Sequence, residues 1–136
     1  SRYTWVFLLR SKSDAAGEII SFINEMDRLN DKVVKQLRSD HGTEFRNHVL
    51  EDFCISKGIS QNFSAVRTPE QNGVAERRNR TLIEAARTML ISSELGKGFW
   101  TEAIRTACYT QNRTTIIARH NKTSYELLTH KKPTLA

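Results

Sequence analysis

Two short segments decide how this chain folds. Residues 34–42 read Val-Lys-Gln-Leu-Arg-Ser-Asp-His-Gly, and residues 68–76 read Thr-Pro-Glu-Gln-Asn-Gly-Val-Ala-Glu. The first alternates apolar and polar residues and ends in a turn, which predicts a strand followed directly by Asp40. The second predicts a polar loop that opens into the first turn of a helix at Glu76. Carboxylates at a strand end and a helix start can converge on one divalent cation, so both are candidate catalytic metal ligands.

The elements predicted around these segments form a mixed α/β domain, because strands and helices alternate along the chain. The continuous apolar run at 3–9 predicts a strand buried on both faces. Residues 65–72 are predicted to be a loop, and the basic, polar residues 121–136 are not expected to form a core of their own. We expect strands over 3–9, 33–39 and 59–64, and helices over 14–29 (capped by Ser13 or Asp14), 47–57, 74–92 (opening at Gly73 or Val74) and 99–112.

Composition bounds the class of protein. The chain has 136 residues, of which 38% are hydrophobic and 26% charged, which fits one domain and excludes a disordered or membrane-spanning class. No signal peptide is visible at the first residues, and because the first residue is not Met we expect the chain to be cut from a longer one. The net charge of +6 favours a polyanionic partner, with a merely basic domain as the equal alternative.

The cysteines, histidines and tryptophans predict no separate metal or redox site. Cys54 and Cys108 lie far apart without a CxxC motif, so they predict neither a zinc site nor a disulfide framework. Cys54 shares the apolar side of its helix with Leu50 and Phe53, so a buried, reduced thiol is expected, which favours an intracellular setting. The histidines show no metal-ligand spacing: His41, His48, His120 and His130. His41 is expected to be an exposed loop residue, with a substrate contact as the alternative. Trp5 and Trp100 are expected to lie in the core.

The predicted helix over 74–92 carries a polar ridge. Glu76, Arg80 and Arg87 lie within about 40° of one another around the helix axis. This ridge could place the carboxylate on a metal ion and the arginines on phosphates. The alternative is a solvated face stabilised by the Glu–Arg spacing of four residues. A separate apolar stripe is predicted at Ala75, Leu82, Ala86 and Met89.

The predicted loop before this helix is rich in groups that can bind nucleic acid. Three polar residues here are poorly suited to a hydrophobic core. Gln71 and Asn72 lie between Pro69 and Gly73, and Arg67 lies two positions before Pro69. Their side chains could bond bases, sugars or phosphates, while a generic surface loop is the alternative.

Asp40 also has an alternative explanation, since Asp before Gly at a strand end is a common turn residue. Glu44 is a rival carboxylate for any metal ion. We favour Asp40 because a strand end is a fixed platform, whereas Glu44 is expected to lie beyond the turn.

Six stretches of the chain, taken together, resemble the integrase core of copia-type LTR retrotransposons, and the plant elements most of all. The resemblance covers essentially the whole chain, and the Pro-Glu-Gln-Asn-Gly-Val-Ala-Glu segment at its distance from Ser-Asp-His-Gly is its most specific part. The stretches are 1–9, 37–45, 67–82, 112–113, 123–127 and 132–133.

The resemblance implies a ribonuclease H-like fold, with a mixed sheet flanked by helices, and a three-acid active site that uses Mg²⁺ or Mn²⁺. Asp40 matches the family's second acid and Glu76 its third. The first acid and two strands belong to sequence upstream of Tyr3, so residues 1–136 are expected to be a partial catalytic core, with 113–136 as its basic C-terminal extension. The isolated chain is therefore expected to be inactive.

The activity implied is the processing of element DNA and the joining of its 3′ ends to target DNA. DNA-contacting residues are expected at Arg67, Gln71, Asn72, Arg80 and Arg87. The resemblance also implies a homo-oligomer, with the helix over 99–112 as a candidate interface, and a location in the nucleus and in cytoplasmic virus-like particles, without a membrane partner. Two alternatives stay open: a relic that binds DNA or a partner without cutting, and a ribonuclease H-type nuclease, against which the Gln-Asn-Gly loop at 71–73 argues.

Overall fold

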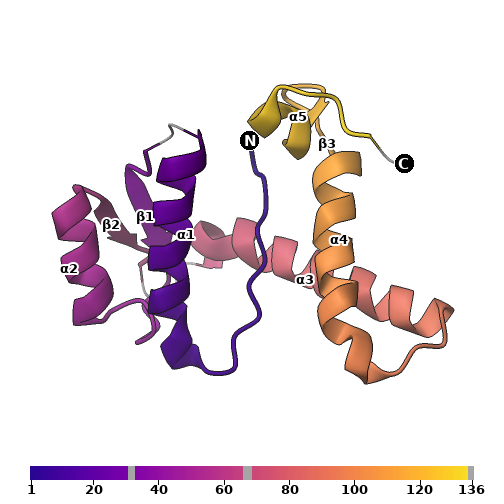
Figure 1. The fold of residues 1–136 in the computed structure, drawn as a ribbon, viewed down its shortest axis with the longest axis horizontal. Coiled ribbons are helices and arrows are strands. Elements are labelled where there is room, and N and C mark those ends of the chain that lie inside the picture. The colour runs from indigo at the N-terminus through magenta and orange to yellow at the C-terminus, as the bar shows by residue number, and fades with distance from the viewer. Residues whose placement is uncertain (31–32, 66–68, 135–136) are drawn as a thin grey trace. The chain divides into compact units, whose positions relative to one another are not determined.

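The computed structural model describes residues 1–30, 33–65 and 69–134, with the backbone alone at residues 30 and 69–72. Figure 1 shows the chain, which divides into two compact units. We call Leu9–Glu76 the acidic unit, because it carries nine Lys and Arg against eleven Asp and Glu. Ser1–Leu8 together with Arg77–Ala136 form the basic unit, which carries twelve against four. The net charge of +6 therefore divides into −2 and +8.

The acidic unit is a strand–helix–strand arrangement preceded by a helix. Its two strands are parallel, with Gln36 opposite Ser60 and Ser39 opposite Phe63, and the helix between them makes the crossover that parallel strands require. A core of Ala16, Ile23, Leu50, Cys54 and Ile59 lies between the helices and the strands. The elements are η1 (Lys12–Asp14), α1 (Ala15–Asn30), β1 (Gln36–Ser39), α2 (His48–Lys57) and β2 (Ser60–Phe63).

Helix ends in this unit follow from local hydrogen bonding. Ser11 is the N-cap of η1, which runs directly into α1, and it forms a reciprocal capping box with Asp14; the predicted caps Ser13 and Asp14 both lie within η1. Asn47 caps α2 by accepting a bond from the Leu50 N–H at 2.9 Å. Gly58 ends α2 with φ +69°, a conformation that glycine adopts at little cost, as its place in the sequence predicted.

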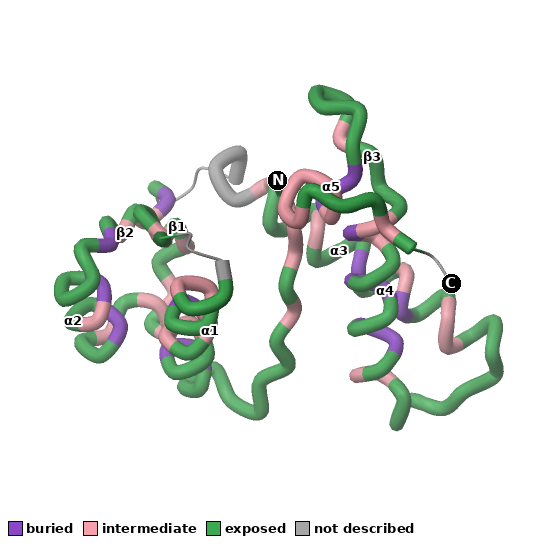
Figure 2. The backbone as a smooth tube through the Cα atoms, turned by 45° about the horizontal axis from the view of Figure 1, so that its top comes forward, coloured by how far each residue is buried: buried purple, intermediate pink, exposed green. Residues whose placement is uncertain are grey.

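The basic unit packs two helices against each other. The predicted apolar stripe is confirmed at Leu82 and Ala86, which are buried, and at Met89, which is half-buried, whereas Ala75 is exposed. Figure 2 shows this alternation of buried and exposed positions along the helices. Ala103, Ile104, Ala107 and Cys108 complete the core. The elements are α3 (Pro69–Ser92), which begins in the acidic unit, η2 (Lys97–Phe99), α4 (Trp100–Thr114), β3 (Ile116–Ile117), β4 (Lys122–Thr123) and α5 (Ser124–Thr129).

The strand predicted over residues 3–9 is wrong, since this segment is not a strand and pairs with none of the strands among the described residues. Phe7 is 47% exposed and Trp5, predicted to be core, is 39% exposed. Instead of a ladder, Asn112 holds the segment: its amide oxygen accepts from the Thr4 N–H at 3.0 Å and its amide nitrogen donates to the Thr4 carbonyl at 2.8 Å. A strand needs a neighbour that supplies these bonds. Trp100 is half-buried against the Ala86 cluster.

One further prediction fails, at the start of α3. α3 begins at Pro69, not at Gly73 or Val74, because proline suits the first helical position, where its missing N–H is not needed. Glu76 is therefore the eighth residue of the helix and not in its first turn. The C-terminal residues 121–134 contribute no member to the hydrophobic clusters of the two units, in line with the prediction, but they are ordered as β4, which pairs with β3, and as α5, where the polar Ser124 is fully buried.

Candidate active site

Asp40 lies where the sequence predicted it, directly after the last residue of β1. Its side chain is exposed, and Oδ1 accepts the Gly42 N–H at 2.9 Å. This bond fixes the orientation of the carboxylate, as in turns that open with Asp. The turn explanation is thus correct for the local structure, and it leaves the second carboxylate oxygen oriented by a rigid backbone.

The turn that carries Asp40 is anchored to both neighbouring elements. The Ser64 N–H donates to the Ser39 carbonyl at 2.9 Å, which holds the end of β1 against β2. Asn47 donates through Nδ2 to the Glu44 carbonyl at 2.8 Å while its Oδ1 caps α2. One side chain therefore joins the turn to the start of α2.

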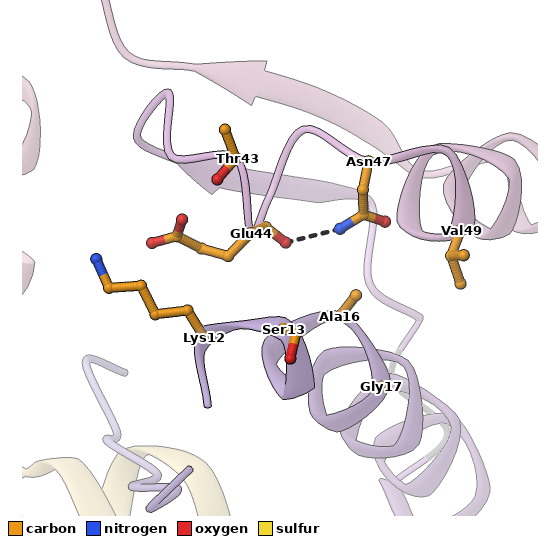
Figure 3. A pocket seen from close by; sticks show the side chains of 8 residues that line it. All are labelled: Lys12, Ser13, Ala16, Gly17, Thr43, Glu44, Asn47 and Val49. Atoms are coloured by element: carbon orange, nitrogen blue, oxygen red, sulfur yellow. Dashed lines mark hydrogen bonds between the residues drawn. The ribbon is translucent and has the colours of Figure 1, made fainter. Parts of the chain in front are cut away.

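Glu44 does not lie beyond the turn, which corrects the prediction. A Cβ atom added at Gly42 would fall 2.6 Å from Glu44 Cδ, so the carboxyl group of Glu44 folds back over the turn. Its side chain lines a cleft of about 460 Å³, which Figure 3 shows with Lys12 reaching the same side. Glu44 therefore remains a real rival to Asp40 as a ligand. The cleft is lined by Lys12, Ser13, Ala16, Gly17, Thr43, Glu44, Asn47 and Val49.

Phe63, at the end of β2, is a contact residue that sequence reasoning missed. Its ring meets the His41 ring edge-on at 5.8 Å between centroids, and the Arg46 guanidinium lies 5.5 Å from its centroid. These contacts tie β2 to the two sides of the Asp40 turn. An aromatic residue that ends a strand beside a polar loop was the available signal. His41 is exposed, as predicted.

The ridge on α3 is exposed at all three of its positions: Glu76, Arg80 and Arg87. Among the residues that the structure describes, neither Glu76 nor Arg80 forms an ion pair, so the alternative of a Glu–Arg stabilised face gains no support. Arg87 also borders a largely apolar cleft of about 620 Å³ at the turn between α3 and α4, with Leu90, Ile91 and Trp100 among its lining residues.

The structure does not describe the side chains of three predicted site residues. Arg67 lies outside the described residues, and Gln71 and Asn72 lie in the first turn of α3, where the backbone alone is described. The approach of Asp40 to Glu76 stays a prediction. Within the described part of the chain, no three His, Cys, Asp or Glu side chains cluster as a metal site. Over the same residues, no helix has the length and apolar character needed to cross a bilayer.

Comparison with known proteins gives sequence relatives of one kind. The chain is 42% identical over 113 residues to the retrovirus-related Pol polyprotein from transposon TNT 1-94 of Nicotiana tabacum, and 35% identical over 113 residues to that from transposon RE2 of Arabidopsis thaliana. Each match covers 83% of this chain and 8% of the relative, so the chain spans a small part of the length of these polyproteins. No family model matches the chain.

Comparison of structures gives viral integrase cores. The catalytic core domain of BIV integrase aligns with a TM-score of 0.63 at 21% identity, covering 91% of this chain and 76% of that one. The HTLV-2 integrase catalytic core domain in complex with magnesium, in its trimeric form, aligns with a TM-score of 0.61 at 21% identity, covering 83% and 69%. These alignments confirm the predicted fold class: a helix-rich α/β fold of the integrase core type.

Proposed function

Because the chain belongs to the copia-type family of retrovirus-related Pol polyproteins, we propose that it is part of the catalytic core of an integrase that joins the 3′ ends of element DNA to target DNA. The observation that carries this proposal is the fixed carboxylate of Asp40 at the end of β1, within a fold shared with integrase cores. The joining reaction is an in-line attack of a DNA hydroxyl on a phosphodiester, so the protein's task is positioning and charge stabilisation.

Asp40 and Glu76 are the residues that would hold Mg²⁺ or Mn²⁺. Their donor set fits, because these ions prefer carboxylate oxygens and both side chains are exposed. The HTLV-2 core among the structural relatives is itself a magnesium complex. Bound at these residues, the ion would stabilise the charge on the attacking and leaving oxygens. A third acid is proposed to come from the longer protein, and the isolated chain is proposed to be inactive.

The remaining candidate residues would orient DNA. Arg80 and Arg87 suit phosphate oxygens, and Arg67 with the amides of Gln71 and Asn72 would contact the backbone or the ends of the DNA. The simian T-cell lymphotropic virus relative is an intasome, and the HTLV-2 core forms dimers and trimers. We extend from these relatives the proposal that the whole protein acts as a homo-oligomer, with α4 as a candidate interface, in the nucleus and in cytoplasmic virus-like particles.

The test is strand joining by the longer Pol-derived protein that includes this chain. With Mg²⁺ present, Asp40→Asn and Glu76→Gln should each lower the joining of a labelled duplex end to plasmid DNA by orders of magnitude. Far-UV circular dichroism and duplex affinity in EDTA should stay unchanged, since both side chains are exposed.

Matched controls separate the metal ligands from other carboxylates. Glu84→Gln changes an exposed carboxylate on the same helix as Glu76 and should leave joining unchanged. Glu44→Gln tests the rival to Asp40. Normal joining in Asp40→Asn combined with lost joining in Glu44→Gln would transfer the ligand role to Glu44. Normal joining in Glu76→Gln would refute the proposed metal site.

A further inference from the structure

The last part of the chain holds a concentration of positive charge that the proposed active site does not use. Between Thr115 and Thr134 there are four Lys and Arg and two His, against the single acid Glu126. All four cationic side chains are exposed. We call these four residues the C-terminal basic face: Arg119, Lys122, Lys131 and Lys132.

This face is built on an ordered platform. Ser124, at the start of α5, is fully buried, and Thr123 beside it is 7% exposed. The Arg113 guanidinium on α4 lies 3.6 Å from the centroid of the Tyr109 ring and 4.4 Å from that of Tyr125, so it packs α5 against α4 through two aromatic faces. Packing therefore holds α5 (Figure 1, yellow), with Lys122 in β4 just before it and Lys131 and Lys132 just after it.

The single acid in this segment is already engaged. Oε2 of Glu126 accepts the Thr123 N–H at 2.8 Å and the Thr123 hydroxyl at 3.0 Å, which completes the capping box of α5. These bonds lower the pKa of Glu126, and the charges of Lys122 and Lys132 add to the effect. Both lysines thus lie near one carboxylate, although one precedes α5 and the other follows it.

The four cations are not engaged in close ion pairs in the part of the chain that the structure describes. The backbone of Lys131 is held to the end of α5, since its N–H donates to Thr129 Oγ1 at 3.3 Å. A face of four exposed cations with one acid, whose oxygen is engaged in the cap of α5, is suited to a polyanion, because each contact with a phosphate releases a condensed counterion.

We infer that the C-terminal basic face binds the phosphate backbone of DNA and that it is a second DNA-binding surface in addition to the candidate residues on α3. The choice of DNA as the polyanion rests on the proposed function. Lysines act as point charges and do not read base edges, so the binding should be independent of sequence. The face would hold a stretch of duplex that is not itself undergoing reaction.

The test measures the affinity of the 136-residue chain for a duplex of random sequence by fluorescence anisotropy, in EDTA, over a series of salt concentrations. The triple variant Lys122→Ala, Lys131→Ala, Lys132→Ala should lower the affinity about tenfold or more and reduce the slope of log K against log salt by about 2 to 3. The matched triple Lys12→Ala, Arg28→Ala, Lys35→Ala removes the same charge from exposed positions of the acidic unit and should change the slope by less than one unit.

The charge-conserving triple variant Lys122→Arg, Lys131→Arg, Lys132→Arg should keep the affinity of the parent chain, and circular dichroism should show that every variant is folded. Equal slopes in the two alanine triples would overturn the inference, because bulk charge would then explain the binding. The parent chain could instead bind phosphatidylserine vesicles more tightly than duplex, and the alanine triple at 122, 131 and 132 could lose vesicle binding while it keeps duplex affinity. That result would assign the face to a membrane and would also overturn the inference.

The design separates this inference from the proposed function. Asp40→Asn and Glu76→Gln should leave the EDTA slope unchanged. If the longer protein joins no DNA but the lysine triple still loses affinity, the proposed function fails and the basic face stands. If joining depends on both carboxylates but the lysine triple binds as the parent does, the basic face fails and the proposed function stands.

Discussion

The acidic and basic units of this chain use charge in opposite ways. In the acidic unit, with a net charge of −2, Lys57 pairs with Asp27 at 3.1 Å, and Asp40 is fixed by a backbone N–H. In the basic unit, with a net charge of +8, arginine is stacked on tyrosines and the lysines of the C-terminal face have no ion pair among the described residues. The comparison teaches that the two units differ in the ligands they suit. The acidic unit holds carboxylates suited to metal cations, and the basic unit holds cations suited to phosphates.

The largest expected effect tests whether each unit has its own core. Leu50 is fully buried in the acidic unit and Leu82 is 3% exposed in the basic unit. Leu50→Ala should lower the free energy of unfolding by about 2–5 kcal/mol, because it leaves a cavity. Urea unfolding followed by circular dichroism measures this change. If the units unfold separately, Leu50→Ala and Leu82→Ala should each move a different transition.

The control for this prediction is Val49→Ala, a neighbouring position that is 66% exposed. It should change the free energy of unfolding by less than about 0.5 kcal/mol. An equally small change in Leu50→Ala would show that the core of the acidic unit is wrongly assigned.

Much of the acidic unit could be predicted from local sequence. The alternation of apolar and polar residues predicted β1, and the spacing of apolar residues together with Gly58 predicted α2. Asp40 lies directly after the end of β1, as expected. Helix caps and strand ends depend on bonds between residues a few positions apart, so the sequence carries them directly. The buried thiol of Cys54 is confirmed for the same reason, and burial raises its pKa.

What failed depends on partners that are distant along the chain. Residues 3–9 have the composition of a strand, but none of the strands in the described ranges pairs with them, and Asn112, 108 positions away, bonds the backbone of Thr4. The fold-back of Glu44 over Gly42 and the contacts of Phe63 depend on the path of the turn, which residue types alone do not specify. Pairing of distant residues is set by tertiary structure, and local propensity does not encode it.

The next prediction concerns this substitute for a strand. Asn112 is 2% exposed and bonds both the N–H and the carbonyl of Thr4. Asn112→Ala should lower the free energy of unfolding by about 1–3 kcal/mol, because it leaves buried polar groups unsatisfied. Hydrogen exchange of the Thr4 amide should become faster in the variant. The exposed Asn62→Ala in β2 is the control, and unchanged exchange at Thr4 would contradict the prediction.

A smaller effect sharpens the comparison of charges on α3. Arg80→Ala and Arg87→Ala should each reduce the salt-dependence slope of duplex binding by about one, as expected for one lost phosphate contact. Arg28→Ala, an exposed arginine of the acidic unit, should not change the slope. Anisotropy titrations at several salt concentrations give all three slopes. A slope for Arg80→Ala equal to that of the parent chain would remove Arg80 from the DNA-binding residues.

The smallest expected effect lies at Glu126, where the two uses of charge meet in one residue. The Thr123 N–H and hydroxyl hold the pKa of this carboxyl below its ordinary value, with Lys122 and Lys132 contributing. A lowered pKa in the folded state means that the stabilisation is present above the ordinary carboxyl pKa and is lost as the pH falls through the folded value. Glu126→Gln should therefore flatten the acid side of the stability profile, measured as Tm against pH, while glutamine keeps the capping box at neutral pH.

The same substitution removes the one acid within the C-terminal basic face, so duplex affinity at neutral pH should rise modestly and the salt slope should not fall. Thr123→Ser, which retains the hydroxyl, should keep the acid-side loss of stability, and Thr123→Val should weaken it, because the valine variant keeps the backbone donor alone. A Glu126→Gln variant with weaker duplex binding at an unchanged Tm would mean that the carboxylate itself aids DNA binding, which is incompatible with a face that works through unpaired positive charge.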